Sequence, residues 1–357
     1  MTKLNRVRKK LQELGMDALL VLSDINRAYL TDFTGSEGIV LITRTDAYLL
    51  VDSRYTIQAK GQVSDFTVEE YSRSQTGAVL NEKLAAAGVK TLGFEEHFIT
   101  YAEYRRFTNN LSVELVPAPP IIEDIRLIKS DVEVAKIRKA CEISDAAFTH
   151  ILTFIKEGIT ELEIANELEA KMRSLGASGS AFDMIVASGE RSALPHGGPT
   201  ERKLQAGDLL TLDFGAIYNG YLSDMTRTIT IGEPNEQLKE IYKIVSHALE
   251  NGLQHIKAGM TGDEVDALTR DIITEAGYGP YFGHSTGHGV GMYIHEGIAL
   301  AKGSKDIVKP GMILTIEPGI YLPGIGGVRI EDDVFIKEDG IEILTKSPKE
   351  LINIKTL

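Results

Sequence analysis

GDLLTLDFG, at residues 207–215, recurs as GMILTIEPG at residues 311–319, an offset of 104 residues. IKEGIT (155–160) likewise recurs as IKAGMT (256–261) at an offset of 101, and in both copies a glutamate follows the final threonine by three residues. That spacing is a capping box, which marks the start of a helix. Two matches in the same order indicate a duplicated helix–helix–hairpin unit. The sequence therefore predicts an α+β domain with pseudo-twofold symmetry.

The first part of the chain has a different pattern. Short apolar segments alternate with helical ones, which is typical of an α/β domain, and these segments cover 18–22, 39–43, 47–51 and 91–94. The proline-rich VPAPP (116–120) predicts a linker, since proline interrupts both helix and sheet. Ser130 and Glu133 form a capping box that predicts a long helix after it. We place the domain boundary at 125/126, with domains 1–125 and 126–357.

Composition narrows the class of protein. The 357 residues are 43% hydrophobic and 25% charged, which excludes a disordered or fibrous chain. A net charge of -13 repels phosphate backbones and anionic lipids, so neither a nucleic acid nor a membrane is an expected partner. The single Cys141 cannot form an internal disulfide, and no segment has the pattern of a signal peptide. These features predict a cytoplasmic protein.

Four carboxylates lie at matched places in the two predicted hairpins. A first hairpin centred between residues 218 and 219 places Asp213 opposite Asp224, and a second centred at Gly324 places Glu317 opposite Glu331. Opposed like charges among apolar residues destabilise a fold unless protons or cations neutralise them. A pair of divalent cations bridged by the carboxylates would do so. Solvated strand positions, or a different register, are the alternatives.

Histidines supply a second signal. Four of the eight lie in glycine- or proline-flanked segments instead of helix interiors, namely His196, His284, His288 and His295. In GHSTGHGVG (283–291) the glycines disfavour helix, and an extended chain places His284 and His288 on the same side. Arg329 lies two residues from Glu331, where it could offset the acidic charge or bind a substrate carboxylate.

Taken together, the set Asp213, Asp224, His288, Glu317 and Glu331, with GHSTGHGVG, TIEPGIY and GGVRIEDD, resembles the pita-bread metallopeptidases, and among them aminopeptidase P and prolidase. The resemblance implies a creatinase-like, ribonuclease-H-like N-terminal domain followed by a pseudo-twofold pita-bread catalytic domain. It makes Asp213 a ligand of one metal, Asp224 and Glu331 bridging ligands, and His288 and Glu317 ligands of the other. It also places His196, His284, His295 and Arg329 among the catalytic residues, with Tyr321 beside them.

The activity that this resemblance implies is hydrolysis of the bond between an N-terminal residue and a following proline. Xaa-Pro aminopeptidase is our first interpretation and Xaa-Pro dipeptidase (prolidase) its alternative, while a methionine aminopeptidase, a metal-free creatinase-like hydrolase and a non-catalytic binding protein are less favoured. We expect Glu317 to accept a proton from the attacking hydroxide and His295 to stabilise the oxyanion.

The expected cofactors are two divalent ions. A donor set rich in oxygen with one imidazole favours Mn²⁺, and Co²⁺ and Zn²⁺ are alternatives. The expected partners are peptides with proline at the second position and a second copy of the chain in a homodimer. In such a dimer, DSRY (52–55) is a loop that could reach a neighbouring active site, although a strand end with a salt bridge is the simpler interpretation.

Overall fold

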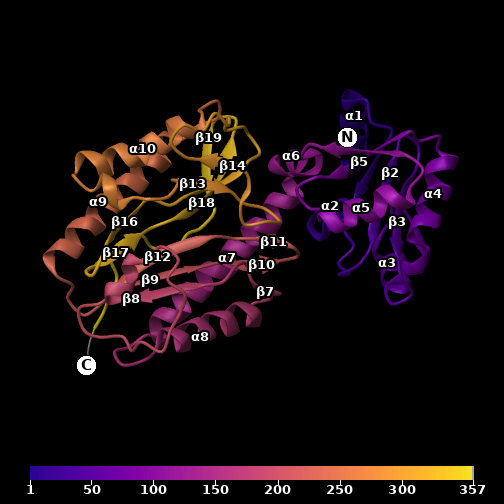
Figure 1. The fold of residues 1–357 in the computed structure, drawn as a ribbon. Coiled ribbons are helices and arrows are strands. Elements are labelled where there is room, and N and C mark those ends of the chain that lie inside the picture. Colours follow the sequence, from indigo (N-terminus) through magenta and orange to yellow (C-terminus); the bar gives the residue numbers. More distant parts are fainter. Residues whose placement is uncertain (356–357) are drawn as a thin grey trace. The chain divides into compact units, whose positions relative to one another are not determined.

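The computed structural model describes residues 1–355 and divides them into two compact units. The first spans Met1–Arg126 and the second begins at Leu127. Figure 1 shows both as mixtures of helices and strands. No helix within the described residues is both long and apolar enough to cross a membrane.

A six-stranded sheet forms the centre of the first unit, in the order β4-β3-β2-β1-β5-β6. The predicted strands are confirmed, and apolar residues buried on both faces of the sheet explain why their sequences are continuously hydrophobic. In chain order the elements are α1 (Lys3–Leu14), β1 (Ala18–Val21), α2 (Asp24–Thr31), β2 (Ile39–Thr43), β3 (Ala47–Val51), α3 (Thr56–Gln62), β4 (Thr67–Glu70), η1 (Arg73–Gln75), α4 (Thr76–Ala86), β5 (Thr91–Glu95), α5 (Tyr101–Asn110), β6 (Glu114–Ala118) and α6 (Ile121–Leu127).

The linker predicted at 116–120 is wrong. Its first three residues belong to β6, which pairs in parallel with β5 and lies at the edge of the sheet. An edge strand tolerates Pro117 because one side of its backbone has no neighbouring strand to receive an N–H. Pro119 and Pro120 then lead directly into α6.

The second unit holds the duplicated segments. Its elements are α7 (Asp131–Phe154), α8 (Glu161–Ser174), β7 (Gly179–Ser180), β8 (Ile185–Ser188), η2 (Gly189–Ala193), β9 (Leu209–Phe214), β10 (Ala216–Tyr218), β11 (Tyr221–Leu222), β12 (Met225–Ile231), α9 (Glu236–His255), α10 (Gly262–Glu275), η3 (Gly279–Tyr281), β13 (Gly287–Gly289), β14 (Glu296–Leu300), β15 (Ile313–Ile316), β16 (Gly319–Leu322), β17 (Gly326–Arg329), β18 (Asp332–Lys337), β19 (Gly340–Ile343) and β20 (Asn353–Ile354). Capping boxes open α7, α8 and α10, as the sequence predicts.

Matching backbone contacts show that the two copies fold alike. The β-bridge Thr160↔Lys203 has its counterpart in Thr261↔Ile307, so the two ends of the bridge are displaced by the offsets found in the sequence. Each bridge lies at the N-cap of the second helix of its copy. The predicted pseudo-twofold repeat is therefore present in the backbone.

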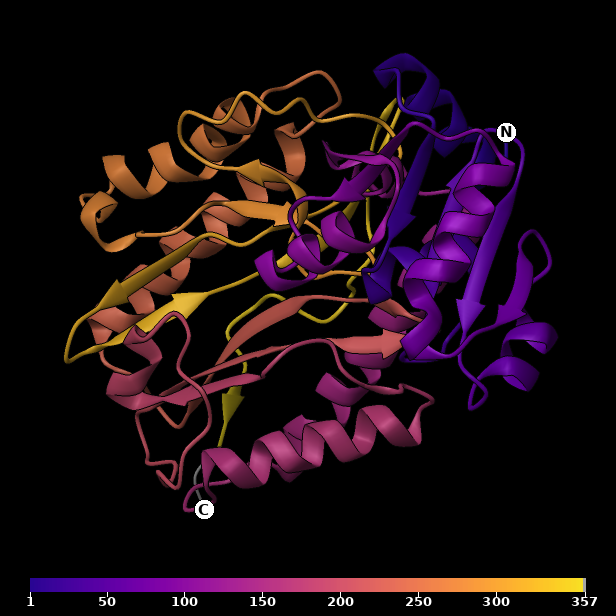
Figure 2. The ribbon, with the colours of Figure 1, turned by 45° about the vertical axis from the view of Figure 1, so that its right-hand side comes forward.

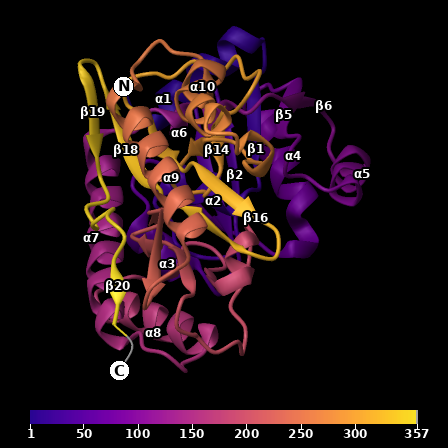
Figure 3. The ribbon, with the colours of Figure 1, turned by 90° about the vertical axis from the view of Figure 1, so that its left-hand side faces the viewer.

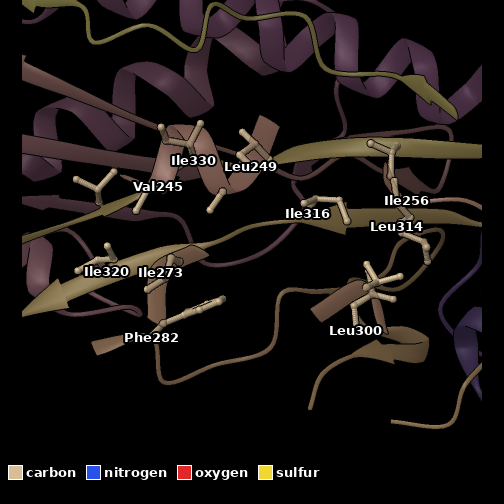
Figure 4. Packing of buried hydrophobic residues seen from close by; sticks show 14 of the residues in the cluster. Val245, Leu249, Ile256, Ile273, Phe282, Leu300, Leu314, Ile316, Ile320 and Ile330 are labelled. Carbon is tan, nitrogen blue, oxygen red and sulfur yellow. The ribbon is translucent and has the colours of Figure 1, made fainter. Parts of the chain in front are cut away.

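Each copy packs its helices on the outer side of its own strands. In Figure 2, α8 (magenta) lies on one side of the strands and α9 and α10 (orange) on the other. Phe148 of α7 and Leu168 of α8 belong to the first apolar core, with residues of β8, β9 and β12. Figure 4 shows the second core, in which Val245 and Leu249 of α9 pack with residues of β15 and β16. β20, labelled in Figure 3, returns to the strands of the first copy, because it pairs in parallel with β12.

The register of the first hairpin differs from our prediction. Asp213 of β9 lies opposite Thr226, not opposite Asp224. The turn is formed by Asn219 and Gly220, which have φ angles of 48° and 80°. A two-residue turn of this type centres the hairpin one residue later than predicted. Since partners move by two residues, Asp224 keeps to the same face of the sheet as Asp213 and becomes its diagonal neighbour.

The register of the second hairpin is confirmed. Ile316 pairs with Asp332 and Gly319 with Arg329, both as expected for a hairpin centred at Gly324. The pairing is interrupted between these pairs, at Glu317 and Glu331. The first hairpin is interrupted in the same way, between β9 and β10 and between β11 and β12. In both copies the ladder therefore opens beside the acidic residues.

Gly215 makes the interruption of the first hairpin possible. A Cβ atom at this position would lie 1.8 Å from the carbonyl oxygen of Ser223. Gly215→Ala should therefore lower the free energy of unfolding by about 2–3 kcal/mol, because the backbone must move to relieve the clash. Gly61→Ala is the control. A Cβ atom at Gly61 would have no such neighbour within 4 Å, and alanine has a higher helix propensity than glycine in α3. Urea denaturation should show opposite signs for the two variants, and an unchanged Gly215→Ala midpoint would contradict this account.

Candidate metal centre

The interrupted hairpins bring the five predicted ligands to one cavity. Asp213 is the second-to-last residue of β9, and Asp224 directly precedes β12. Glu317 directly follows β15, and Glu331 directly precedes β18. His288 lies at the centre of β13, which pairs with β14 and β15. All five side chains line a cavity of about 900 Å³. Each copy thus contributes two carboxylates, and the second copy adds the imidazole.

The distances among these groups suit shared ligation. One donor atom each of Asp224, His288 and Glu331 lie within 4.8 Å of one another. His288 Nε2 is 3.7 Å from Asp224 Oδ2 and 3.4 Å from Glu317 Oε1. Asp213 lines the same cavity as these residues. Oxygen-rich clusters of this kind are the donor sets that hard divalent cations prefer.

Neighbouring side chains hold two of the carboxylates and the backbone of a third residue in place. Thr226 donates its hydroxyl to Glu331 Oε2 at 2.6 Å, and Arg329 Nη2 donates to Asp213 Oδ2 at 2.5 Å. Behind the cavity, Asp333 Oδ2 accepts the main-chain N–H of Asp224 at 2.8 Å. The first two bonds each engage one oxygen of a carboxylate that lines the cavity and leave its other oxygen for a ligand, while the third fixes the backbone of Asp224.

Burial makes the fully ionised form of the carboxylate cluster unfavourable in free energy. Removal from water, reinforced by the neighbouring carboxylates, raises the pKa of both Asp224 and Glu331 well above the usual range. Burial also raises the pKa of Glu317 to about 7. The same cause lowers the pKa of His288, so its imidazole is neutral and able to act as a ligand.

The donor set fits divalent cations. Asp213 Oδ1 is buried and, within the described residues, has no hydrogen-bond partner. A buried carboxylate oxygen without a partner is rare, and a bound ion satisfies it. Cations would also lower the raised pKa values of the surrounding acids, since an opposite charge favours the ionised form. Asp213, Asp224, His288, Glu317 and Glu331 are the residues that could hold them.

A pH dependence of stability follows for the metal-free protein. Glu317 and Asp333, whose pKa values burial raises to about 7, keep protons that the unfolded chain has released. Their contribution to stability is therefore lost as the pH rises through 7, at up to about 1.4 kcal/mol per pH unit for each group. His284 acts in the opposite sense, because burial lowers its pKa to about 4 and its contribution is complete above the unfolded value near 6.5.

Thermal unfolding with a chelator should thus show a lower midpoint at pH 8 than at pH 6.5, and saturating Mn²⁺ should remove this decline. A metal-free midpoint that rises over this interval would contradict the assigned burial of the acids.

The remaining predicted histidines lie around the same cavity. His196, His284 and His295 all line it, and the rings of His288 and His295 pack edge to face at 4.4 Å. His284 Nδ1 donates to the Ser285 carbonyl at 2.7 Å, and its Nε2 accepts from the Tyr321 hydroxyl at 2.8 Å. His284 and His288 do lie on the same side, because both approach Glu317.

The Arg329 side chain forms its hydrogen bonds with other residues of the protein. Besides Asp213, its guanidinium donates to the Tyr321 hydroxyl at 2.7 Å, to the Pro195 carbonyl at 3.1 Å and to the Thr226 hydroxyl at 3.1 Å. Of the two roles that the sequence left open, the structure supports compensation of the acidic charge. Four of its five N–H groups are engaged in this way.

Sequence reasoning missed two supporting residues. Thr226 lies two residues after Asp224 on the same strand face, and only the observed register shows that it bonds to Glu331. Asp333 belongs to the acidic run that ends GGVRIEDD, but its partner is the backbone of Asp224, 109 residues away in sequence. Spacing alone signals neither contact, because both join different hairpins.

Comparison with known proteins agrees with this geometry. Residues 135–338 match the model of metallopeptidase family M24, and residues 3–128 match the creatinase/prolidase N-terminal domain. The chain is 40% identical to the Xaa-Pro dipeptidase of Pyrococcus horikoshii, over 98% of both chains. A solved Xaa-Pro dipeptidase from Bacillus anthracis has a TM-score of 0.96 at 49% identity, covering 98% of this chain and 99% of its own. An X-Pro aminopeptidase from Thermotoga maritima MSB8 has a TM-score of 0.90 at 40% identity, covering 96% and 99%. With a creatinase-type N-terminal domain followed by a pita-bread catalytic domain, the chain belongs to metallopeptidase family M24.

Proposed function

We propose that this protein is an Xaa-Pro dipeptidase that uses two divalent cations. The observation that carries the proposal is the convergence on one cavity of four carboxylates from the duplicated hairpins and of four histidines from other segments of the same unit. The chain is a metallo-exopeptidase by its family. The Bacillus anthracis Xaa-Pro dipeptidase is 49% identical to the chain, against 40% for the Thermotoga maritima X-Pro aminopeptidase, which favours the alternative over our first interpretation from sequence.

In this proposal Asp213, Asp224 and Glu331 would hold one cation. Asp224, Glu331, His288 and Glu317 would hold the other. When bound, such ions act as Lewis acids that polarise a carbonyl and lower the pKa of water. Oxygen-rich ligation favours Mn²⁺. We also propose that the protein forms a homodimer and is located in the cytoplasm.

Glu317 is the residue best placed to move a proton. Its carboxylate lies between the two histidines, with Oε1 3.4 Å from His288 Nε2 and Oε2 3.9 Å from His284 Nδ1. It can accept the proton of the attacking water and return it to the leaving proline nitrogen. His295, whose pKa burial lowers, is neutral at pH 7 and can donate an N–H to the carbonyl oxygen as negative charge develops there.

Proline at the second position changes what the site must recognise. The Xaa-Pro bond is a tertiary amide without an N–H, so the ring itself must be bound. Apolar side chains on the cavity wall, such as Phe182, Ile294 and Ile298, offer surface for the ring. His196 and His284, which line the same cavity, are the polar groups proposed to orient the peptide.

The proposal is tested with three matched peptides. Mn²⁺-loaded protein is incubated with Leu-Pro, Leu-Pro-Gly and Leu-Ala, and products are identified by mass spectrometry, with a chelated sample as control. We expect kcat/KM for Leu-Pro to exceed that for either other peptide by at least about tenfold. Faster release of leucine from Leu-Pro-Gly would instead establish an Xaa-Pro aminopeptidase, and preferential cleavage of Leu-Ala would reject proline specificity.

A further inference from the structure

A buried ion pair on α10 faces the segment that carries His284. Asp266 is 1% exposed and Arg270, one helical turn later, is 20% exposed. Two hydrogen bonds join them, from Nε at 2.5 Å and from Nη2 at 2.9 Å. Neither residue lines the cavity or belongs to the predicted ligand set. The pair therefore needs an explanation of its own, because isolated buried ion pairs contribute little net stability.

Both members of the pair bond to the backbone between η3 and β13. Arg270 Nη1 donates to the Phe282 carbonyl at 2.8 Å, and Nη2 donates to the His284 carbonyl at 2.6 Å. Asp266 Oδ1 accepts the Thr286 main-chain N–H at 3.2 Å and its hydroxyl at 2.8 Å. The guanidinium also stacks on the Phe282 ring at 4.2 Å. Every second residue of the segment is thus fixed to α10.

This segment reaches the candidate metal centre at two points. It carries the His284 imidazole, which approaches Glu317 and accepts the Tyr321 hydroxyl. In addition, the Thr286 carbonyl accepts the main-chain N–H of Glu317 at 2.7 Å. A displacement of the segment would therefore move both the imidazole and the backbone of a predicted ligand.

We propose that Arg270 is a positioning residue that acts through His284, with Asp266 orienting its guanidinium. The inference rests on the proposed function only in that His284 must take part in peptide cleavage. Arginine is required because its planar group donates to a carboxylate and to two carbonyls at once, whereas lysine offers a point charge. Arg270→Lys therefore keeps the charge and removes the fork.

The duplication provides a matched control. On α8, the counterpart of α10, Arg173 forms an i,i+4 pair with Glu169, one turn further along the helix than the repeat offset would place it, and donates to the Ser178 carbonyl at 2.6 Å. Its side chain is 54% exposed, and the residue it bonds to is not among those that line the cavity. Arg173→Lys thus makes the same chemical change in an equivalent helix without loosening the His284 segment.

The first test needs no activity. Hydrogen exchange of the metal-free protein, read by mass spectrometry on peptides covering 280–290, should be at least about tenfold faster in Arg270→Lys than in wild type. Arg173→Lys should change it by less than about twofold. Asp266→Asn, which removes one charge at constant size, should accelerate the same peptides. Unchanged exchange in both Arg270→Lys and Asp266→Asn would overturn the proposal.

The second test is a double-mutant cycle with His284→Ala. Arg270→Lys should lower kcat/KM for Leu-Pro by about tenfold in wild type and by less than about twofold in the His284→Ala background. The same factor in both backgrounds would show a general structural role and reject action through His284. If wild type cleaves no peptide, the proposed function fails, while hydrogen exchange still decides whether Arg270 orders the segment.

Discussion

Glu331→Gln is expected to lower kcat/KM for Leu-Pro by at least about a thousandfold and yet leave the metal-free protein at least as stable as wild type. Glu331 is 2% exposed and lies close to Asp224, His288 and Glu317. Its charge repels the two neighbouring carboxylates unless a cation is bound. Glutamine keeps the shape and one acceptor for Thr226 but removes the negative charge. The cation site is thereby weakened, whereas repulsion in the empty site is relieved.

These opposite effects are measured on one preparation. Steady-state kinetics with Mn²⁺ and metal analysis after gel filtration report the site, and urea denaturation with a chelator at pH 8 reports stability. Glu342→Gln is the control, because that carboxylate lies 26% exposed in a surface ion pair with Arg138. A Glu331→Gln variant that keeps its bound metal and wild-type rate would remove Glu331 from the site.

Arg329→Met should give the largest loss of stability. The guanidinium is 3% exposed, and its removal leaves Asp213 and three further acceptors without their donor. Breaking a buried, hydrogen-bonded ion pair from one side costs about 3–5 kcal/mol. Because Asp213 and Tyr321 would also lose their orientation, we expect kcat/KM to fall by at least about a hundredfold.

Arg138→Met provides the comparison for this variant. Its side chain is 41% exposed and its partner Glu342 is partly solvated, so we expect a change below about 1 kcal/mol. Both variants are measured by urea denaturation with and without Mn²⁺. Equal stabilities for the two would contradict the assignment of Arg329 as the compensating charge of the carboxylate cluster.

The fold was predictable from sequence because local signals agreed with one another. Capping boxes at Thr160 and Thr261 mark equivalent helices, and the repeated nine-residue segments carry Asp213 and Glu317 at the same position. The predicted register of the first hairpin was wrong because Asn219 and Gly220 form the turn. The left-handed conformation of both residues shifts the centre of the hairpin by one position. The predicted face of Asp224 was nevertheless correct, because a shift of two residues returns a side chain to the same face of the strand.

Other features depend on contacts that no local pattern contains. Pro117 indicates a linker unless the residue is known to lie in an edge strand, and strand order is a tertiary property. The bond from Arg270 to the His284 carbonyl joins a helix to a loop, and no local pattern predicts it. The sequence indicates only that Arg270 can form an i,i+4 ion pair with Asp266 on a helix. Metal identity and substrate length remain predictions, because oxygen-rich donors accept several cations and the cavity exceeds the size of a dipeptide.

Anomalous diffraction from crystals of the Mn²⁺-loaded protein tests the central claim most directly, namely that the duplicated hairpins build a site for two cations. We expect two peaks in the cavity, both next to Asp224 and Glu331, one also next to Asp213 and the other also next to His288 and Glu317. Peaks elsewhere, or a fully loaded protein with no anomalous density among these five side chains, would contradict it.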